Sequence, residues 1–476
     1  MVFSSVAFVF FFLPVVLAAY YLAPRSLRNG VFFLAGLAFY LWGAGEIVFV
    51  LLGSVLLNWV CGLAAAGRGR KRGWTARQRI AVGIALLGNL GILAYFKYAG
   101  FAVEELNRLG WWVAGRTWFT VPDVLLPIGV SFFTFQGMSY VLDVAKGTVR
   151  ALRNPVDFGM YIAMFPQLVA GPIVRFHQVA KQIRGRRHTL EGIAAGAVRF
   201  AHGLFKKVCI ADTVAVIVDQ AYGPSSGTPG FATAWIGSVG FLVQIYFDFS
   251  GYSDMAIGLG RMFGFRLPEN FHRPYSAASM TEFWQRWHMT LTGWFREYLY
   301  LPLALRRTRD WQLHPITLLV FLLIGLWHGA EWTFLIFGLQ HAIIMILERA
   351  FGVQRRFRHA PVWPRRLVTM LLLLTSIVWF RAPSAAAAVE MFRGMAGLAG
   401  TGVWAFSEAY ALHWLALGAG LVSLFLPKDF VAGPFLERSR SPLAVTWRLA
   451  AATLGMAAAI LLMVTQSYRA FIYFRF

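Results

Sequence analysis

The sequence predicts an all-α, polytopic integral membrane protein of about 11–13 membrane helices, re-entrant segments included. Of its 476 residues, 58% are hydrophobic and only 14% are charged, whereas a soluble chain carries about a quarter charged residues. Apolar stretches long enough to cross or enter a bilayer recur along the whole chain. We see no internal repeat and no low-complexity linker, and therefore interpret residues 1–476 as one transmembrane domain.

The first apolar stretch, residues 4–23, lacks a basic segment before it and a small-residue cleavage site after it. We therefore interpret it as a retained helix and not as a signal peptide. The stretches at 29–44, 155–173 and 314–330 are short or interrupted by Pro and Gly, so we expect them to be re-entrant or tilted. The full set of stretches is 4–23, 29–44, 46–66, 80–98, 121–145, 155–173, 192–220, 231–263, 314–330, 332–349, 367–382, 408–427 and 447–467.

The net charge of +23 is unevenly distributed. Lys and Arg gather in alternate loops, which the positive-inside rule places on the cytoplasmic side of the membrane. This placement argues against nucleic-acid binding. It predicts contact with anionic lipid headgroups of the bilayer and with any anionic cytosolic substrate. If 155–173 enters and leaves on one side, both termini lie outside. The basic segments are 68–79, 175–187, 261–309, 349–366 and 428–448.

The sequence offers no familiar soluble-enzyme site. The two cysteines, Cys61 and Cys209, both lie in apolar stretches, so we expect neither a disulfide framework nor a cysteine metal site. We find no Gly-rich phosphate loop, no nucleophile elbow and no HExxH pattern. We therefore expect no metal and no bound cofactor.

An ionisable residue at membrane depth marks the most informative segment, residues 325–330 (Gly-Leu-Trp-His-Gly-Ala). Burying His328 there is costly, so it should face a cavity or a partner group inside the protein. Histidine can accept and return a proton near neutral pH. The alternative is a structural histidine bonded to a backbone carbonyl.

Two carboxylates lie inside the predicted span 231–263. Asp248 and Asp254 are six residues apart and would face different directions on a continuous helix, although Gly251 could break it. This spacing is only weak evidence that the two carboxylates act together in acid–base chemistry. The alternative is that both bond local backbone or a nearby Arg.

Residues 284–298 show helical periodicity of aromatic and apolar residues, with Arg286 and Arg296 between them. A helix rich in Trp and Arg belongs at a membrane–water interface. An anchor alone would not need His288 among the apolar positions, so we expect that His288 and His328 can share a cavity. The apolar face comprises Trp284, Trp287, His288, Leu291, Trp294, Phe295 and Tyr298.

The segment from Pro166 to Arg175 contains Pro166, Gly171 and Pro172, which interrupt a helix. Broken backbone at membrane depth is tolerated where it is buried or lines a wet cavity. A plain surface turn is the alternative.

Together these segments resemble the membrane-bound O-acyltransferase family, in particular its bacterial branch that acetylates exported polysaccharides. The resemblance covers nearly the whole chain. Its motifs are Met-Val-Phe-Ser-Ser at 1–5, Tyr-Phe-Lys-Tyr at 95–98, Leu-Pro-Ile-Gly-Val-Ser-Phe at 126–132, Phe-Pro-Gln-Leu-Val-Ala-Gly-Pro at 165–172, the stretch 246–256, Phe-Trp-Gln-Arg-Trp-His at 283–288, residues 325–330 and Trp-Phe-Arg-Ala at 379–382.

The resemblance implies acyl transfer, with His328 as the principal catalytic residue and His288 as a second active-site member. We expect Asp248, Trp284 and Trp327 to help bind substrate. Similar proteins often carry Gly-Gly-Asn-Arg after the Tyr-Leu-Tyr that lies here at 298–300. This chain has Leu-Pro-Leu-Ala-Leu-Arg-Arg, whose Arg306 and Arg307 we expect to meet the donor.

These expectations describe a multi-pass acetyltransferase with acetyl-CoA as co-substrate. The acceptor would be an exported polysaccharide such as alginate, reached directly or through a periplasmic transferase or esterase-like partner and the polysaccharide export machinery. Transfer of another acyl group, such as D-alanine from a carrier protein to a cell-wall polymer, is the rival enzyme. A proton-coupled transporter is a weaker rival, because we see no paired repeats with matching broken helices.

Overall fold

The computed structural model describes residues 2–67, 73–223, 228–357, 359–399, 405–425, 441–465 and 471. These residues form helices joined by loops, which confirms the all-α prediction. The basic segments 68–72 and 428–440 lie outside the described residues. By length and composition, seven of the described helices can cross a membrane. The chain is therefore polytopic, as predicted.

The seven spans are fewer than the predicted 11–13 membrane helices. Arg28–Ala65 holds two of the predicted stretches in one 38-residue helical run, within which Gly45 turns the chain with φ of 56°. Phe8–Leu22 and Ala411–Leu424 are apolar but shorter than a full span. Hydrophobicity located these apolar stretches correctly. The lengths of the helices that they form depend on tertiary packing.

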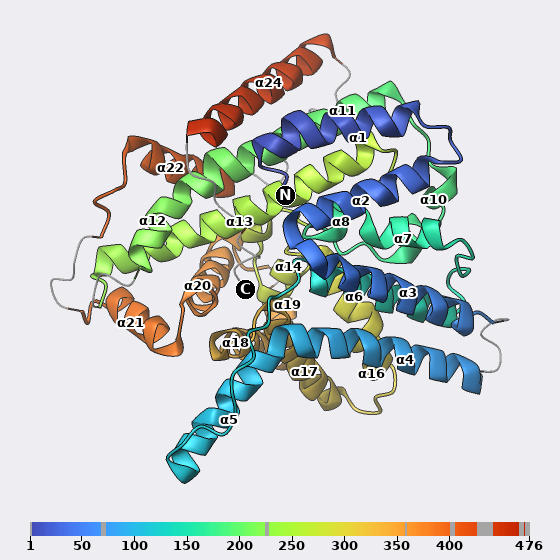
Figure 1. Cartoon of the computed structure of the whole chain (residues 1–476). Helices are drawn as coiled ribbons and strands as arrows, with labels where there is room; N and C mark the ends of the chain where they lie inside the picture. Colours follow the sequence, from blue (N-terminus) through green and yellow to red (C-terminus); the bar gives the residue numbers. More distant parts are fainter. Residues whose placement is uncertain are drawn as a thin grey trace. The chain divides into compact units, whose positions relative to one another are not determined.

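The chain divides into two compact units, residues 1–194 with 259–268 and residues 195–258 with 269–476. The single-domain interpretation stays a prediction. Figure 1 labels the larger helices of both units. Those of the first unit are η1 (Phe8–Phe12), α1 (Leu13–Leu22), α2 (Arg28–Ala44), η2 (Gly45–Ile47), α3 (Val48–Ala65), α4 (Ala76–Leu93), η4 (Ala94–Tyr98), α5 (Ala99–Ala114), α6 (Val130–Ala145), α7 (Pro155–Ala163), α8 (Phe165–Leu168), α9 (Phe176–Val179) and α10 (Gln182–Gly185).

In the first unit, α3 packs against α4, α6 and α7, and α2 packs against α7 (Figure 1). The interrupted segment predicted at 155–173 forms the short helices α7 and α8, and every residue from 157 to 174 is buried. Its backbone is bonded internally: the Tyr161 hydroxyl donates to the Val174 carbonyl at 2.8 Å, and Gln167 Nε2 donates to the Tyr161 carbonyl at 2.6 Å. The surface-turn alternative is therefore wrong.

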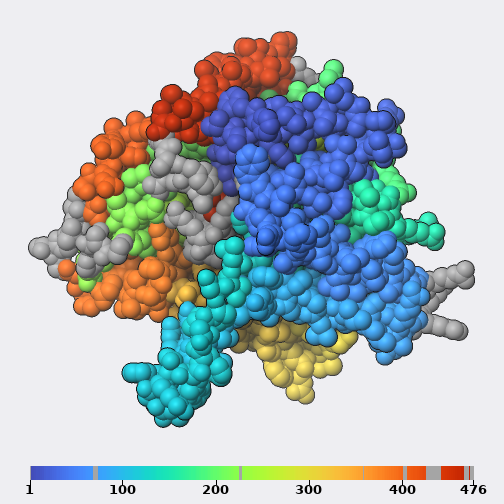
Figure 2. All heavy atoms as spheres, in the orientation of Figure 1, coloured from blue at the N-terminus to red at the C-terminus, as the bar shows by residue number. Residues whose placement is uncertain are grey.

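A helical run of 39 residues, α4 through α5, is longer than the predicted stretch 80–98. At 1.5 Å per residue it measures about 58 Å, against a hydrocarbon core of about 30 Å. In Figure 2 the end of α5 (cyan) protrudes from the other helices of the first unit. Trp112 there is 86% exposed. Aromatic residues of this kind are typical of a membrane–water interface.

The helices of the second unit include two that cross its boundary in sequence, α11 and α13. They are α11 (Leu190–Phe205), η5 (Lys206–Asp212), α12 (Thr213–Ala221), α13 (Phe231–Met262), η6 (Pro274–Ser276), α14 (Met280–Trp284), α15 (Met289–Phe295), η7 (Arg296–Tyr300), α16 (Leu301–Ala304), η8 (Asp310–Gln312), α17 (Leu313–His328), α18 (Trp332–Ala350), α19 (Val353–Arg356), α20 (Val362–Arg381), α21 (Ala385–Met395), α22 (Ala411–Phe425) and α24 (Pro442–Thr465).

Two glycines bring α17 and α18 into backbone contact. A Cβ at Gly325 would lie 2.3 Å from the Phe334 carbonyl oxygen, and a Cβ at Gly338 would lie 2.4 Å from the Phe321 carbonyl oxygen. No side chain fits at either position, so the helices meet where only glycine allows it. This contact lies one turn from His328 and holds the end of α17 against α18.

Candidate acyl-transfer site

His328 is the last residue of α17. The helix ends there because Gly329 is extended, with φ of −167°. The imidazole is buried among aromatic rings: its centroid lies 5.0 Å from that of Phe380 and 5.7 Å from that of Phe337. Phe337 comes from α18 and Phe380 from α20, so three helices fix the position of the ring.

His328 lines a small internal cavity of about 30 Å³. This volume is enough for a water molecule. The walls come from α13, η6, α14, α17, α18 and α20, and from Trp287 between α14 and α15. Half of the wall residues are purely apolar, and the side-chain N–H and O–H groups belong to Tyr275, Trp284, Trp287, His328, His341 and Ser376.

Three of these groups already donate their hydrogen to a protein acceptor. The Tyr275 hydroxyl donates to the Leu242 carbonyl at 2.9 Å. The Ser376 hydroxyl donates to the Leu373 carbonyl at 2.9 Å. Trp284 Nε1 donates to His341 Nδ1 at 3.3 Å. Three of the six groups are thus satisfied within the protein. Among the described wall residues, the side chains whose reference pKa in water lies near neutrality are the two imidazoles.

His341 on α18 is the residue that our sequence interpretation missed. Its Nδ1 accepts a hydrogen bond from Trp284, which only a neutral imidazole can do, so the ring proton resides on Nε2. The signal was present in the sequence. His341, like His328, is an ionisable residue inside a predicted apolar stretch, 332–349, and the same cost of burial applies to it.

His288 lies at a break and not within a continuous helix. Its φ and ψ are 42° and 51°, the left-handed region, and it separates α14 from α15. The predicted single helix over 284–298 is therefore wrong. The reason is long-range: Asn270 accepts hydrogen bonds from the Met289 N–H at 2.9 Å and from the Thr290 hydroxyl at 2.8 Å. A non-glycine residue in this conformation carries strain, which is typical of functional sites.

The same asparagine orients the His288 ring. Asn270 Oδ1 lies 3.1 Å from Nδ1 and can only accept, so Nδ1 carries the proton. Among the described residues Nε2 has no hydrogen-bond partner. His288 lies outside the candidate spans, and burial lowers its pKa to about 3. The ring is therefore neutral at physiological pH.

His288 does not line the cavity that holds His328, so the expected shared cavity is not observed. The two histidines are connected through Trp327 instead. The Trp327 ring lies 5.6 Å from His288 and 4.9 Å from His328, edge-on in both cases. Trp284 lines the cavity directly, whereas Trp327 contacts both histidines.

Each of the two carboxylates of α13 has a cationic partner. Asp248 lies 2.7 Å from Lys207 Nζ, and both side chains are only 2% exposed. Asp254 pairs with Arg199 at 2.5 Å and with Lys206 at 2.6 Å. The expected bonding to a nearby cation is therefore present, although the partner of Asp248 is a lysine. Asp248 is not on the wall of the cavity.

Gly251 does not break α13, because the helix continues through it to Met262. A Cβ at Gly251 would lie 2.8 Å from the Gly203 carbonyl oxygen, so this glycine permits close packing of α13 on α11.

Arg306 and Arg307 follow α16 on an exposed segment. Arg307 pairs with Asp310 at 3.2 Å, a contact open to solvent. Neither arginine lines the cavity. Their placement is compatible with contact to a soluble anionic ligand and with contact to lipid headgroups.

The geometry thus combines a buried histidine at a helix end, a second histidine, which is neutral, on the same cavity wall, and apolar surroundings.

Residues 150–382 match the model of MBOAT, the membrane-bound O-acyltransferase family. The chain is 40% identical over 426 residues to the probable alginate O-acetylase AlgI of Pseudomonas aeruginosa. The aligned residues make up 89% of this chain and 80% of that protein. The chain belongs to the membrane-bound O-acyltransferase family.

Other proteins similar to this chain carry different names. The peptidoglycan O-acetyltransferase of Helicobacter pylori is 33% identical over 442 residues, covering 86% of this chain and 82% of that protein. The teichoic acid D-alanyltransferase of Bacillus subtilis is 26% identical over 234 residues, covering 47% of this chain and 59% of that protein. As a membrane-bound O-acyltransferase, the chain is a multi-pass membrane enzyme. The roles of its individual residues stay predictions.

Proposed function

We propose that this membrane-bound O-acyltransferase moves an acetyl group from cytosolic acetyl-CoA to hydroxyls of an exported polysaccharide such as alginate. The transfer is direct or passes through a periplasmic partner enzyme. The observation that carries the proposal is the cavity shared by His328 and His341, in a chain about 40% identical to alginate O-acetylases over most of its length.

His328 is the proposed base. Its neutral imidazole takes the proton of the acceptor hydroxyl while the hydroxyl oxygen attacks the thioester carbonyl carbon. The carbon–sulfur bond then breaks, and the proton passes from His328 to the departing thiolate. A two-step route, in which His328 first takes the acetyl group on nitrogen, uses the same neutral ring. The apolar surround favours the neutral imidazole in both routes.

His341 supplies the second element of the proposal. Since its Nδ1 is held by Trp284, Nε2–H is the donor that the ring offers. Negative charge develops on the acetyl carbonyl oxygen during attack, and a fixed N–H donor in a water-poor site stabilises it. His288 acts as a positioning residue through Trp327, which contacts both His288 and His328.

The proposed orientation places the basic loops in the cytoplasm of a bacterial inner membrane. Arg306 and Arg307 then face the nucleotide phosphates of acetyl-CoA. Anionic groups are attracted to such a surface, and the attraction falls with ionic strength.

The test uses membrane vesicles that contain the full chain, isotopically labelled acetyl-CoA and the polysaccharide. Label should appear on polysaccharide hydroxyls with wild-type protein and not with His328→Ala. Parallel reactions supply D-alanyl carrier protein in place of acetyl-CoA. Transfer of D-alanine without transfer of acetyl would overturn the proposal in favour of the rival enzyme.

A further inference from the structure

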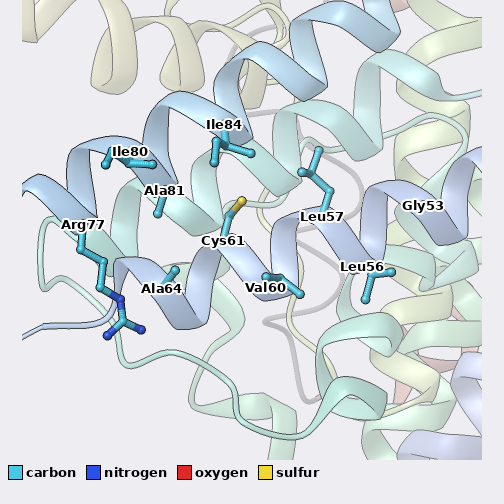
Figure 3. Close-up of a pocket in the computed structure, with 10 residues that line it drawn as sticks. All are labelled: Gly53, Leu56, Leu57, Val60, Cys61, Ala64, Arg77, Ile80, Ala81 and Ile84. Carbon is cyan, nitrogen blue, oxygen red and sulfur yellow. The ribbon is translucent and has the colours of Figure 1, made fainter.

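An apolar groove runs between α3 and α4 in the first unit, and none of the residues that line it takes part in the proposed chemistry (Figure 3). Its volume is about 680 Å³. The walls are the side chains of Leu56, Leu57 and Val60 from α3 and of Ile80 and Ile84 from α4. Both helices belong to candidate membrane spans, so the groove opens at membrane depth.

The length of the groove matches one leaflet. Along α3 it extends from Gly53 to Ala64. These 11 steps of a helix measure about 16 Å, which is half of a hydrocarbon core of about 30 Å. Small residues at Gly53, Ala64 and Ala81 leave the space unfilled.

Among the described residues that line the groove, one is positively charged, and it lies at one end. Arg77 lies there, in the first turn of α4, and is exposed (Figure 3). The helix N-terminus adds a partial positive charge of its own. The surrounding sequence 68–79 is one of the basic segments that we predict to be cytoplasmic, and anionic lipids concentrate at such segments.

We propose that this groove binds an anionic phospholipid of the cytoplasmic leaflet, with one acyl chain between α3 and α4 and the phosphate on Arg77. An apolar trough of leaflet length that ends in one cation is complementary to an amphiphile with one anionic head. The residues that line this groove and those that line the acyl-transfer cavity are different, so we assign the groove a structural or regulatory lipid and not the acyl donor. The inference does not depend on the identity of the acceptor.

The structure provides matched variants. Gly53→Leu fills the groove, since a Cβ at Gly53 has no atom within 4 Å. Gly83→Leu is its control: Gly83 on α4 also has open space within 4 Å, but does not line the groove. Arg77→Gln removes the charge, and Arg79→Gln removes an equal charge two residues away that does not line the groove.

The measurement is native mass spectrometry of the full detergent-solubilised chain, titrated with phosphatidylglycerol or phosphatidylcholine. Wild-type protein should retain one phosphatidylglycerol with about fivefold preference, the contribution of one basic residue near a surface. Arg77→Gln should lose the preference and Gly53→Leu should lose the retained lipid, while both controls behave as wild type.

Equal effects of Arg77→Gln and Arg79→Gln would overturn the site in favour of diffuse surface attraction. Unchanged retention in Gly53→Leu would show that the lipid binds elsewhere. A dimer mass that disappears in Gly53→Leu would assign the groove to a second copy of the chain.

Discussion

The imidazole of His288 lies edge-on against the indole of Trp327, with ring centroids 5.6 Å apart, and Trp327 directly precedes His328. A strained residue at the break between two short helices is thereby linked to the end of a membrane helix. Although His288 does not line the cavity, its contact with Trp327 can therefore affect the position of the His328 ring.

We expect His328→Ala to abolish acyl transfer while leaving the protein folded and inserted. Loss of a general base lowers kcat by about 10²–10⁴-fold. Transfer in membrane vesicles measures the effect, and thermal unfolding in detergent checks the fold. His314→Ala, at the other end of the same helix, is the control and should retain activity. Near-normal transfer by His328→Ala would rule out a catalytic His328.

We expect His288→Ala to lower kcat severely, because Trp327 loses its ring contact and Asn270 loses a hydrogen-bond donor. Alanine is also disfavoured at φ of 42°. His288→Gly, which tolerates that backbone, separates the two causes and should be equally impaired. Arg286 contacts Ser276 and Glu282 within the protein, so Arg286→Ala should lower stability more than kcat. A fatal Arg286→Ala with a harmless His288→Ala would reduce this segment to an anchor.

We expect His341→Leu to lower kcat by about 10²–10³-fold with little change in KM for the donor, as for loss of an oxyanion donor. Trp284→Phe keeps an aromatic ring but removes the N–H that fixes the His341 tautomer, so its loss should be smaller. His341→Gln, which restores an N–H donor, should recover part of the rate. Equal activity of the Leu and Gln variants would argue for a packing role.

Replacing Arg306, Arg307 and Arg309 together with Gln should raise KM for the donor more than it lowers kcat. These exposed charges act through solvent, where the screening length is about 8 Å at physiological salt. The wild-type KM should therefore rise with salt, and that of the triple variant should rise less. Unchanged donor dependence would leave these arginines with a topological role.

A cysteine at position 70, which lies outside the described residues, should resist a membrane-impermeant maleimide in intact cells because its loop is predicted to be cytoplasmic. Trp112→Cys provides the positive control, since Trp112 is 86% exposed on α5 and predicted to lie outside. Ready labelling at position 70 would reverse the topology.

The helices were predictable where local hydrophobicity decides them. The apolar runs 231–263 and 332–349 correspond closely to α13 and α18, because burial of a long apolar run requires a helix at membrane depth. In the predicted stretch 121–145, helix α6 starts only at Val130, after Gly129 adopts φ of 75°. Gly129 approaches the backbone at Leu168, a contact from a distant segment that periodicity cannot reveal.

The candidate site was predictable in part for the same reason. His328 stood out as an ionisable group in an apolar stretch. The break at His288 did not, because it depends on hydrogen bonds that Asn270, 18 residues earlier, accepts. The pairing of Trp284 with His341 spans 57 residues. Contacts of this range arise from the fold and leave no local signature.

The glycine contact between α17 and α18 also determines which positions around the cavity can be substituted. Since any larger residue at Gly325 or Gly338 would push the two helices apart, natural or laboratory variation cannot adjust the His328 end of α17 from that side. The opposite wall, formed by α20, presents Leu373, Ser376 and Ile377 to the same space. Selection for new acceptors should therefore accumulate substitutions on α20, and comparisons among acetylating and D-alanylating relatives should find their size differences there.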